Sequence, residues 1–250
     1  MRLAATAALA WALAACAGAP APEPGPEATR QPELPPLGAR SVEHWLQVRR
    51  PELLGLFEQH VYGRAPTDLG APEFEVLATD SDALAGLATR LVVHIALPTV
   101  PAWPGMDVLL YVPNDAEWPV PCFVGLNFGG NHTVTPEAGV PLPRGVLAAD
   151  EHGEARRGAA AGRWPLEAIL RRGFAVATAW YGDIEPDRPG GWQKGLRGAA
   201  SPAGAATVWR NGDWGAIGAW AFGLSRIADY LEREVLVDAD RLAVLGHSRL

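Results

Sequence analysis

The chain ends in a serine whose neighbours suit nucleophilic catalysis. An apolar run, Leu242–Leu245, leads directly into Gly246–Leu250, which reads Gly-His-Ser-Arg-Leu. In a nucleophile elbow the serine lies on a strained turn after a strand, and a small residue two places earlier lets the backbone pass close to its neighbours. Gly246 stands at that place relative to Ser248. Because the chain holds 28 glycines, Gly-x-Ser also arises by chance, so an ordinary loop serine is the competing interpretation.

Serine catalysis also needs a histidine base and a carboxylate that orients it. In hydrolases that carry such an elbow, the acid and the histidine follow the serine along the chain. His247 adjoins Ser248, and its side chain points away in an elbow; the remaining histidines all precede the serine, at positions 44, 60, 94, 132 and 152. We therefore expect the acid and the base to lie beyond Leu250, and these 250 residues alone to be inactive and insoluble or partly unfolded.

Neither a metal nor a cofactor is predicted. The sequence has no His-Glu-x-x-His pattern and no pair of cysteines at ligand spacing. Cys122 lies in the apolar run Val120–Phe128, where a free cysteine usually packs as a small hydrophobic residue, so it is given no catalytic role. A net charge of −7 without a basic stripe argues against a nucleic-acid partner.

The first residues resemble an export signal. Residues 1–15 begin with Met1-Arg2 and continue as an alanine-rich apolar run that is too short to span a bilayer. The run ends in Leu-Ala-Ala-Cys, which resembles a bacterial lipobox with Cys16 as the lipidated residue; an ordinary secretory signal with a chance cysteine is the alternative. Residues 16–40 are rich in Pro, Ala and Glu, which predicts an extended tether. We expect an exported protein, anchored by lipid at the outer membrane or periplasmic face, or secreted.

Residues 41–250 are expected to form the folded part. Apolar spacing from Trp45 to Val61 predicts helix. Strand-like runs follow, and the short links between the first three favour an antiparallel start; the runs are Phe74–Ala78, Thr89–Leu97, Val108–Val112, Val120–Phe128, Phe174–Trp180 and Arg241–Gly246.

Later segments alternate helix and strand. A helix is predicted at Trp164–Arg172, ended by Gly173, and another from Ile217 to Leu231 with Ile217 on its core face and Asp213 as N-cap. Asp238 and Asp240 are expected in the turn before the last strand. Such alternation implies a mostly parallel sheet with right-handed crossovers. The predicted fold class is α/β, consistent with an α/β-hydrolase or another mixed sheet.

Two loops after predicted strands could also carry chemistry. Gly129, Gly130 and Asn131 occupy a position where these hydrolases shape the oxyanion side of the cleft, although a tight glycine turn without ligand contact is the simpler account. The carboxylates of segment 183–187 (Asp183, Glu185 and Asp187) follow the next strand. Paired carboxylates suit glycoside hydrolysis, whereas the prolines and glycine of this segment favour a solvated or structural loop.

Five blocks of the sequence, in order, resemble carbohydrate esterase family 15, the glucuronoyl esterases. They are Pro51–Leu54 with His60–Arg64, Gly125–Thr133, Tyr181–Asp187, Trp214–Ile217 and Gly246–Leu250. Many fungal members have cysteine where this chain has His247, and bacterial members often match the form seen here. The resemblance, which runs from about Ser41 to Leu250, is to the N-terminal portion of a bacterial lipoprotein member.

This resemblance implies a three-layer α/β-hydrolase acting on esters of glucuronic acid, such as the linkage between the 4-O-methyl-glucuronate of xylan and lignin alcohols. By that analogy Ser248 attacks the uronate carbonyl to give an acyl-enzyme. Arg249 would stabilise the oxyanion through its backbone N–H and its guanidinium. Two alternatives remain: an acetylxylan esterase of the same fold, and a surface lipoprotein that binds carbohydrate without catalysis.

Overall fold

The computed structural model describes residues 36–144, 156–201 and 210–250. The predicted signal peptide, the lipidation site Cys16 and most of the predicted tether lie outside the described residues. Among the residues that are described, no helix combines the length and the apolar character that crossing a membrane requires.

The chain forms two compact units that meet between Arg49 and Arg50. The described part of the first unit holds α1 (Val42–His44) and the wider helical turn η1 (Trp45–Arg49). The Ser41 hydroxyl caps α1 by accepting a hydrogen bond from the backbone N–H of His44 at 3.0 Å. No side chain of α1 or η1 is buried.

The second unit begins with helix and continues into a sheet. Its first helical segments are α2 (Arg50–Phe57) and η2 (Glu58–Tyr62), so the helix predicted from the apolar spacing is confirmed within each unit. Gly63 ends η2 with a φ of 73°, and a Cβ there would meet the backbone carbonyl of Asp213. A side chain at this position would therefore be excluded both by its backbone conformation and by space.

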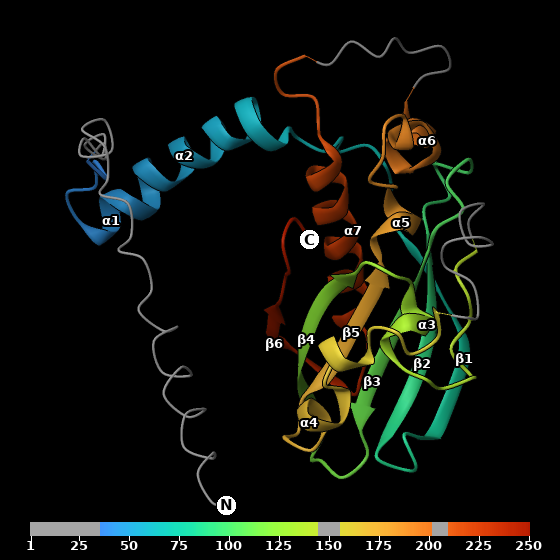
Figure 1. The fold of residues 1–250 in the computed structure, drawn as a ribbon. Coiled ribbons are helices and arrows are strands. Elements are labelled where there is room, and N and C mark those ends of the chain that lie inside the picture. Colours follow the sequence, from blue (N-terminus) through green and yellow to red (C-terminus); the bar gives the residue numbers. More distant parts are fainter. Residues whose placement is uncertain (1–35, 145–155, 202–209) are drawn as a thin grey trace, which may run out of the picture. The chain divides into compact units, whose positions relative to one another are not determined.

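Six strands form one sheet in the order β1-β2-β3-β5-β4-β6 (Figure 1). Antiparallel pairing joins β1 to β2, β2 to β3 and β3 to β5, while β4 is parallel to both β5 and β6. The predicted antiparallel start that leads into parallel strands is confirmed. The strand bounds are β1 (Glu73–Ala83), β2 (Ala88–Ala96), β3 (Met106–Pro113), β4 (Val120–Asn127), β5 (Ala175–Trp180) and β6 (Val237–Val244).

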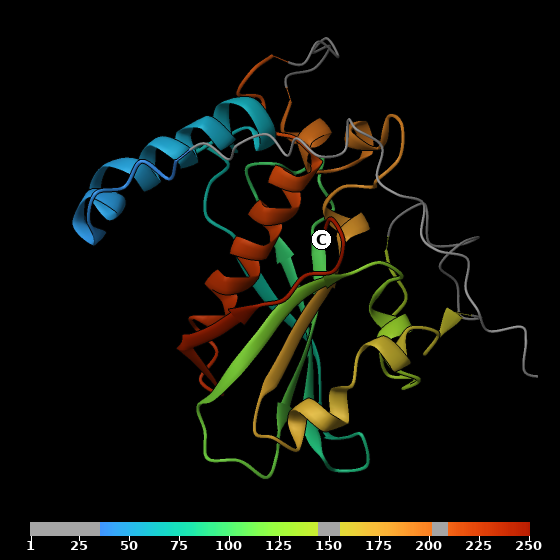
Figure 2. The ribbon, with the colours of Figure 1, turned by 60° about the vertical axis from the view of Figure 1, so that its left-hand side comes forward.

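Apolar residues on both faces of the sheet create two cores. Along β3, Val108 and Leu110 pack into the core that includes α7 (Ala216–Leu231), whereas Leu109 and Tyr111 pack into the core that includes α4 (Leu166–Leu170). Successive side chains of a strand point to opposite faces, so a continuous apolar run serves both cores. Figure 2 shows the resulting three layers, with α7 and α4 on opposite faces of the sheet.

The short helical segments lie in the connections between these elements. Those after β4 and β5 are α3 (Asn131–Val134), η4 (Ala161–Arg163) and α5 (Tyr181–Ile184), followed by η5 (Gly191–Lys194) and α6 (Leu196–Ala200). Because the sequence predicted none of them separately, they are additions to the expected α/β arrangement.

Three predictions about the helices α4 and α7 are wrong: a start, an N-cap and a buried residue. The helix expected to begin at Trp164 begins at Leu166, after Pro165. Asp213 does not cap α7: its N-cap is Gly215, and the Asp213 carboxylate instead accepts a hydrogen bond from the backbone N–H of Arg210 at 2.7 Å. Ile217 is exposed, since the buried face of α7 runs through Ala219, Trp220, Gly223, Ile227, Tyr230 and Leu231.

The last strand begins earlier than predicted, because Asp238 and Asp240 belong to β6. The pairing of β6 with β4 is irregular there: Val237 lies opposite Val120, and the next partner of β4 is Leu242, opposite Cys122. Within this bulge the Asp238 carboxylate accepts a hydrogen bond from the backbone N–H of Asp240 at 3.0 Å. The predicted turn before the strand is therefore wrong: Asp238 and Asp240 lie inside β6, where its pairing with β4 is irregular.

Candidate active site

Ser248 lies on a strained turn four residues past the end of β6 at Val244. Its φ is 58°, and the other described non-glycine residues with a positive φ are Leu84 and Ala85, in the β1–β2 turn. A positive φ is unfavourable for a residue with a Cβ and is found where the surrounding structure enforces it. A nucleophile elbow imposes this kind of strain on its serine.

Close backbone packing explains the glycine in the Gly-x-Ser motif. A Cβ on Gly246 would collide with the backbone carbonyl of Leu250. On the neighbouring strand, a Cβ on Gly125 would lie 2.7 Å from the Leu245 carbonyl oxygen. The backbone N–H of Leu245 donates to Val124 at 2.9 Å, and that of Leu250 donates to His247 at 3.1 Å. The turn therefore folds back on itself and packs closely against β4. This close approach requires glycine at positions 125 and 246.

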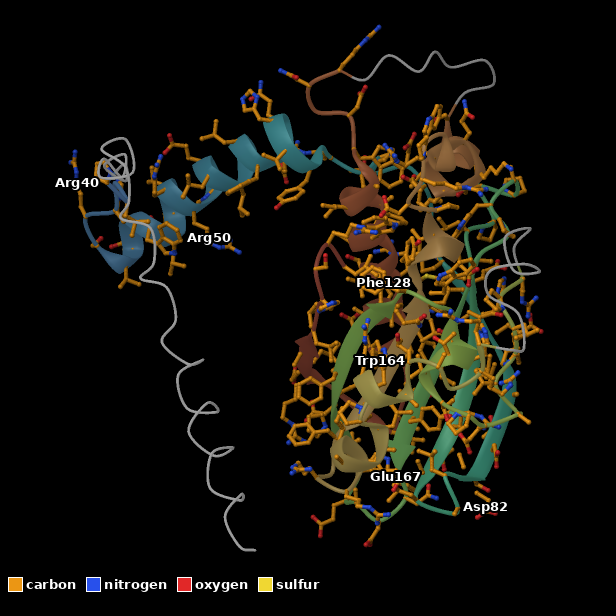
Figure 3. The ribbon with its side chains drawn as sticks, viewed as in Figure 1. Arg40, Arg50, Asp82, Phe128, Trp164 and Glu167 are labelled. Carbon is orange, nitrogen blue, oxygen red and sulfur yellow. The ribbon has the colours of Figure 1, made fainter. Side chains whose placement is uncertain are left out.

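The turn shares its surroundings with loops that follow β4 and β5. All three parallel strands end at one edge of the sheet, which is where ligand sites form in such sheets (Figure 1). Phe128, after β4, is labelled at this edge in Figure 3. Its ring centroid lies 6.0 Å from that of His247 and 5.8 Å from that of Tyr181, both in edge-on geometry.

Arg249 reaches into the same group of side chains. Its guanidinium carbon lies 5.6 Å from the centroid of the Phe128 ring, and its Nε forms an ion pair with Oδ2 of Asp187. The side chains of Arg249 and Asp187 are 49% and 32% exposed. Ion pairs this open to water contribute about 0–1 kcal/mol to stability, so this one does little to hold the fold together.

Two residues before Asp187, Glu185 forms a very different ion pair. Its side chain is 1% exposed, and its carboxylate accepts hydrogen bonds from Nε and a terminal nitrogen of Arg197, at 2.6 and 2.5 Å. Arg197 also donates to the backbone carbonyl of Trp214 at 2.8 Å. The indole N–H of Trp220 donates to the carbonyl of Glu185 at 2.9 Å. These bonds anchor the loop, which supports the structural-loop interpretation for Glu185 over a catalytic carboxylate pair.

Asp183, the first carboxylate of the loop, is partly buried near Asp107 on β3. Burial, with a smaller contribution from the Asp107 carboxylate, raises the pKa of Asp183 to about 7. Asp107 itself lies 2.7 Å from Nδ1 of His94 and accepts a hydrogen bond from Arg144 at 2.9 Å. Asp107 is thus compensated by two neighbours, while Asp183 is the carboxylate that holds its proton into the neutral range.

The glycine loop after β4 is tied into the sheet. Asn127 donates to the side-chain oxygen of Asn131 at 2.8 Å and accepts from the backbone N–H of Gly130 at the same distance. Asn131 in turn donates to the backbone carbonyl of Asp107 at 2.7 Å. Gly130 has a φ of 96°, and a Cβ on Gly129 would lie 2.7 Å from the Thr133 hydroxyl oxygen. The arrangement accounts for this sequence as a turn, and an oxyanion role for Gly129–Asn131 stays a prediction.

The structure brings some predicted site residues together and adds one. Ser248 and Arg249 share one turn, and Phe128 and Asp187 join them from the loops after β4 and β5. The sequence did not predict the ion pair between Asp187 and Arg249. The two residues lie in different loops, and in a sequence they cannot be told from unpaired surface charges. Cys122 is buried and free, and burial raises the pKa of its thiol to about 12, in keeping with a packing role.

A hollow of about 320 Å³ lies away from the turn that holds Ser248. It is apolar, is lined by Leu84, Val134, Trp164 and the start of α4, and contains none of the candidate residues. Figure 3 places Glu167, on its wall, far from the labelled Phe128. We therefore assign the candidate site by backbone strain and side-chain chemistry rather than by cavity size.

Comparison with known proteins identifies relatives. A curated carbohydrate esterase from an unknown prokaryotic organism is 39% identical over 223 residues, which cover 84% of this chain and 50% of that protein. A solved glucuronoyl esterase from Solibacter usitatus is 40% identical with a TM-score of 0.80, over 88% of this chain and 58% of that one. A promiscuous CE15 esterase from a marine bacterial metagenome is 37% identical with a TM-score of 0.71, over 84% and 54%.

These matches confirm the resemblance predicted from the five sequence blocks, and with it the α/β-hydrolase type of fold. The chain spans about half the length of the relatives it matches. No protein-family model matches it.

Proposed function

Because the chain is a relative of carbohydrate esterase family 15, we propose that the protein is a serine esterase that cleaves 4-O-methyl-glucuronoyl esters between xylan and lignin alcohols. The observation that carries this proposal is the strained backbone of Ser248, whose φ is 58° in the turn that follows the parallel strand β6. An ordinary loop serine has no need of that conformation, whereas a nucleophile elbow requires it. The similarity to glucuronoyl esterases supports the choice of a uronate ester.

The proposed reaction proceeds through an acyl-enzyme. The Ser248 hydroxyl oxygen bonds to the ester carbonyl carbon while its proton passes to a histidine base. The backbone N–H and guanidinium of Arg249 stabilise the negative oxygen of the tetrahedral intermediate. Cleavage of the carbon–oxygen bond releases the alcohol, which takes the proton from the histidine. Water then attacks the acyl carbon while the histidine takes its proton, and the histidine returns that proton to the Ser248 oxygen as the acyl–oxygen bond breaks, which releases the glucuronate.

The decisive experiment measures ester hydrolysis by the full-length protein and its Ser248→Ala variant. We expect turnover of benzyl glucuronate by the wild type and its complete loss in the variant, because no other group supplies the nucleophile. Ser225→Ala is the matched control: this serine lies exposed on α7 and donates to the Ala221 carbonyl at 3.1 Å. Acetate release from acetylated xylan without uronate ester cleavage would replace the proposed substrate. Carbohydrate binding with no hydrolysis of either ester would overturn the enzymatic proposal.

We also propose that Cys16 carries a lipid that anchors the protein at the bacterial membrane. The Leu-Ala-Ala-Cys sequence after an apolar run supports this, followed by a proline-rich stretch suited to a tether. Labelling of cells with a palmitate analogue should mark the wild type and not the Cys16→Ser variant. Equal labelling of both would exclude the anchor.

A further inference from the structure

Two contacts from two different loops hold the guanidinium of Arg249. Asp187, from the loop after β5, forms an ion pair with its Nε, and Phe128, from the loop after β4, presents its ring 5.6 Å from the guanidinium carbon. An arginine side chain has many rotamers and loses that freedom only when neighbours fix it. In this structure these two contacts restrict the side chain that follows Ser248 in the same turn.

The carboxylate, rather than the arginine, is the rigid partner of this pair. Asp187 follows Pro186, which is buried, and a Cβ on Gly191 would collide with the Pro186 carbonyl. Glu185, one residue further back, is clamped by Arg197 in the interior. The backbone before Asp187 is therefore fixed by the buried residues Glu185 and Pro186. The side chain of Asp187 contacts Arg249 of the turn after β6.

Stability does not explain why a carboxylate should stand here. Both side chains are too exposed for the pair to contribute much to folding. An oxyanion donor, by contrast, acts only within hydrogen-bond distance of the developing charge and gains most when it is fixed beforehand. Asp187 therefore has two opposite effects: its charge weakens the field of Arg249, and its contact with Nε orients the guanidinium.

We propose that Asp187 is a positioning residue that holds the Arg249 guanidinium in place beside Ser248 before the ester binds. This inference rests on the proposed function. It assigns Asp187 no contact with substrate: its influence passes through Arg249. Loss of Asp187 should slow the chemical step and leave binding of the ester nearly unchanged, because the arginine acts on the oxyanion of the intermediate.

The kinetic test compares single and double variants of the full-length protein on benzyl glucuronate. Arg249→Ala should lower kcat about 100- to 1,000-fold, the usual effect of removing an oxyanion donor. Asp187→Ala should lower kcat about three- to fivefold, the most that so exposed a contact can contribute to orientation, with KM changed less than about twofold, and Asp187→Glu should restore part of the loss. The double variant should be no slower than Arg249→Ala alone. Asp229→Ala is the matched control, since Asp229 pairs with Arg226 on α7 at similar exposure.

A second measurement does not depend on turnover. With ¹⁵N-labelled arginine, the Nε–H signal of Arg249, assigned from its loss in Arg249→Lys, should shift and exchange faster with water in Asp187→Ala but not in Asp229→Ala. An unchanged signal overturns the positioning role whatever the kinetics. Turnover of Asp187→Ala within about twofold of wild type, or independent effects in the double variant, overturns it as well. If the wild type hydrolyses no ester, the proposed function itself fails, and the catalytic meaning of Asp187 fails with it.

Discussion

Glu185 and Asp187 lie two residues apart in the loop after β5, and each carboxylate pairs with an arginine. The inner pair, Glu185 with Arg197, is 1% and 9% exposed, and Arg197 donates a further hydrogen bond to a backbone carbonyl. The outer pair, Asp187 with Arg249, is 32% and 49% exposed and lies beside the strained serine. One short stretch of sequence therefore has an interior end and a solvent-facing end.

The difference in burial gives the two pairs different tasks. In the interior, each charge needs its partner, because an isolated buried charge is very unfavourable. At the surface, water can replace either partner, and an ion pair matters mainly through the orientation it imposes. We infer that the inner pair fixes the loop to α6 and α7, and that the outer pair uses this fixed loop to orient Arg249.

The largest expected effect comes from breaking the inner pair. Glu185→Ala leaves Arg197 charged in the interior and should lower the free energy of unfolding by about 3–5 kcal/mol. Denaturant unfolding followed by tryptophan fluorescence measures the loss. The control is Glu167→Ala, which breaks an exposed ion pair with Arg171 and should cost less than about 0.5 kcal/mol. An equal loss of unfolding free energy in the two variants would show that the buried ion pair contributes no more to stability than the exposed one.

An intermediate effect is expected at Asp183, which is partly buried and has a pKa of about 7. Its folded-state pKa lies above its ordinary value, so the folded protein binds this proton more tightly, and stability is lost as the pH rises from about 4 to about 7. Asp183→Asn removes that dependence. The variant should gain about 1–3 kcal/mol relative to the wild type at pH 8 compared with pH 4.

Unfolding curves of the wild type and Asp183→Asn at a series of pH values test this prediction. The wild type serves as the control at each pH. A constant difference between the two proteins from pH 4 to pH 8 would mean that Asp183 titrates in the folded protein as it does in the unfolded chain.

The smallest stability effect is expected at the outer pair. Asp187→Ala should change the free energy of unfolding by less than about 1 kcal/mol, although it is expected to slow catalysis. The same denaturant measurement used for Glu185→Ala makes the comparison direct. A cost of several kcal/mol would place Asp187 in the same structural class as Glu185, and the contrast between the two ends of the loop would be lost.

Much of the fold was predictable because burial leaves a periodic trace in the sequence. The runs that became β2, β3 and β5 contribute apolar residues to both cores, and the run that became β4 contributes to the core that includes α7. Prediction failed where local chemistry had more than one outcome. Asp213 is a good helix cap by type, yet it bonds Arg210. Asp238 and Asp240 read as a turn, yet pairing with β4 draws them into β6.

For the candidate site, the sequence by itself determined the Gly-x-Ser motif, its place after a strand and its likeness to carbohydrate esterase family 15. These are local patterns, and neighbouring residues suffice to state them. Only the tertiary structure decided that Ser248 has a positive φ, that Glu185 faces the interior and that Asp187 meets Arg249. Backbone strain and charge pairing depend on which loops the sheet brings to one edge, and that depends on strand order. Two acidic residues in one loop, Glu185 and Asp187, therefore look similar in sequence and differ in burial and partner once the strands have paired.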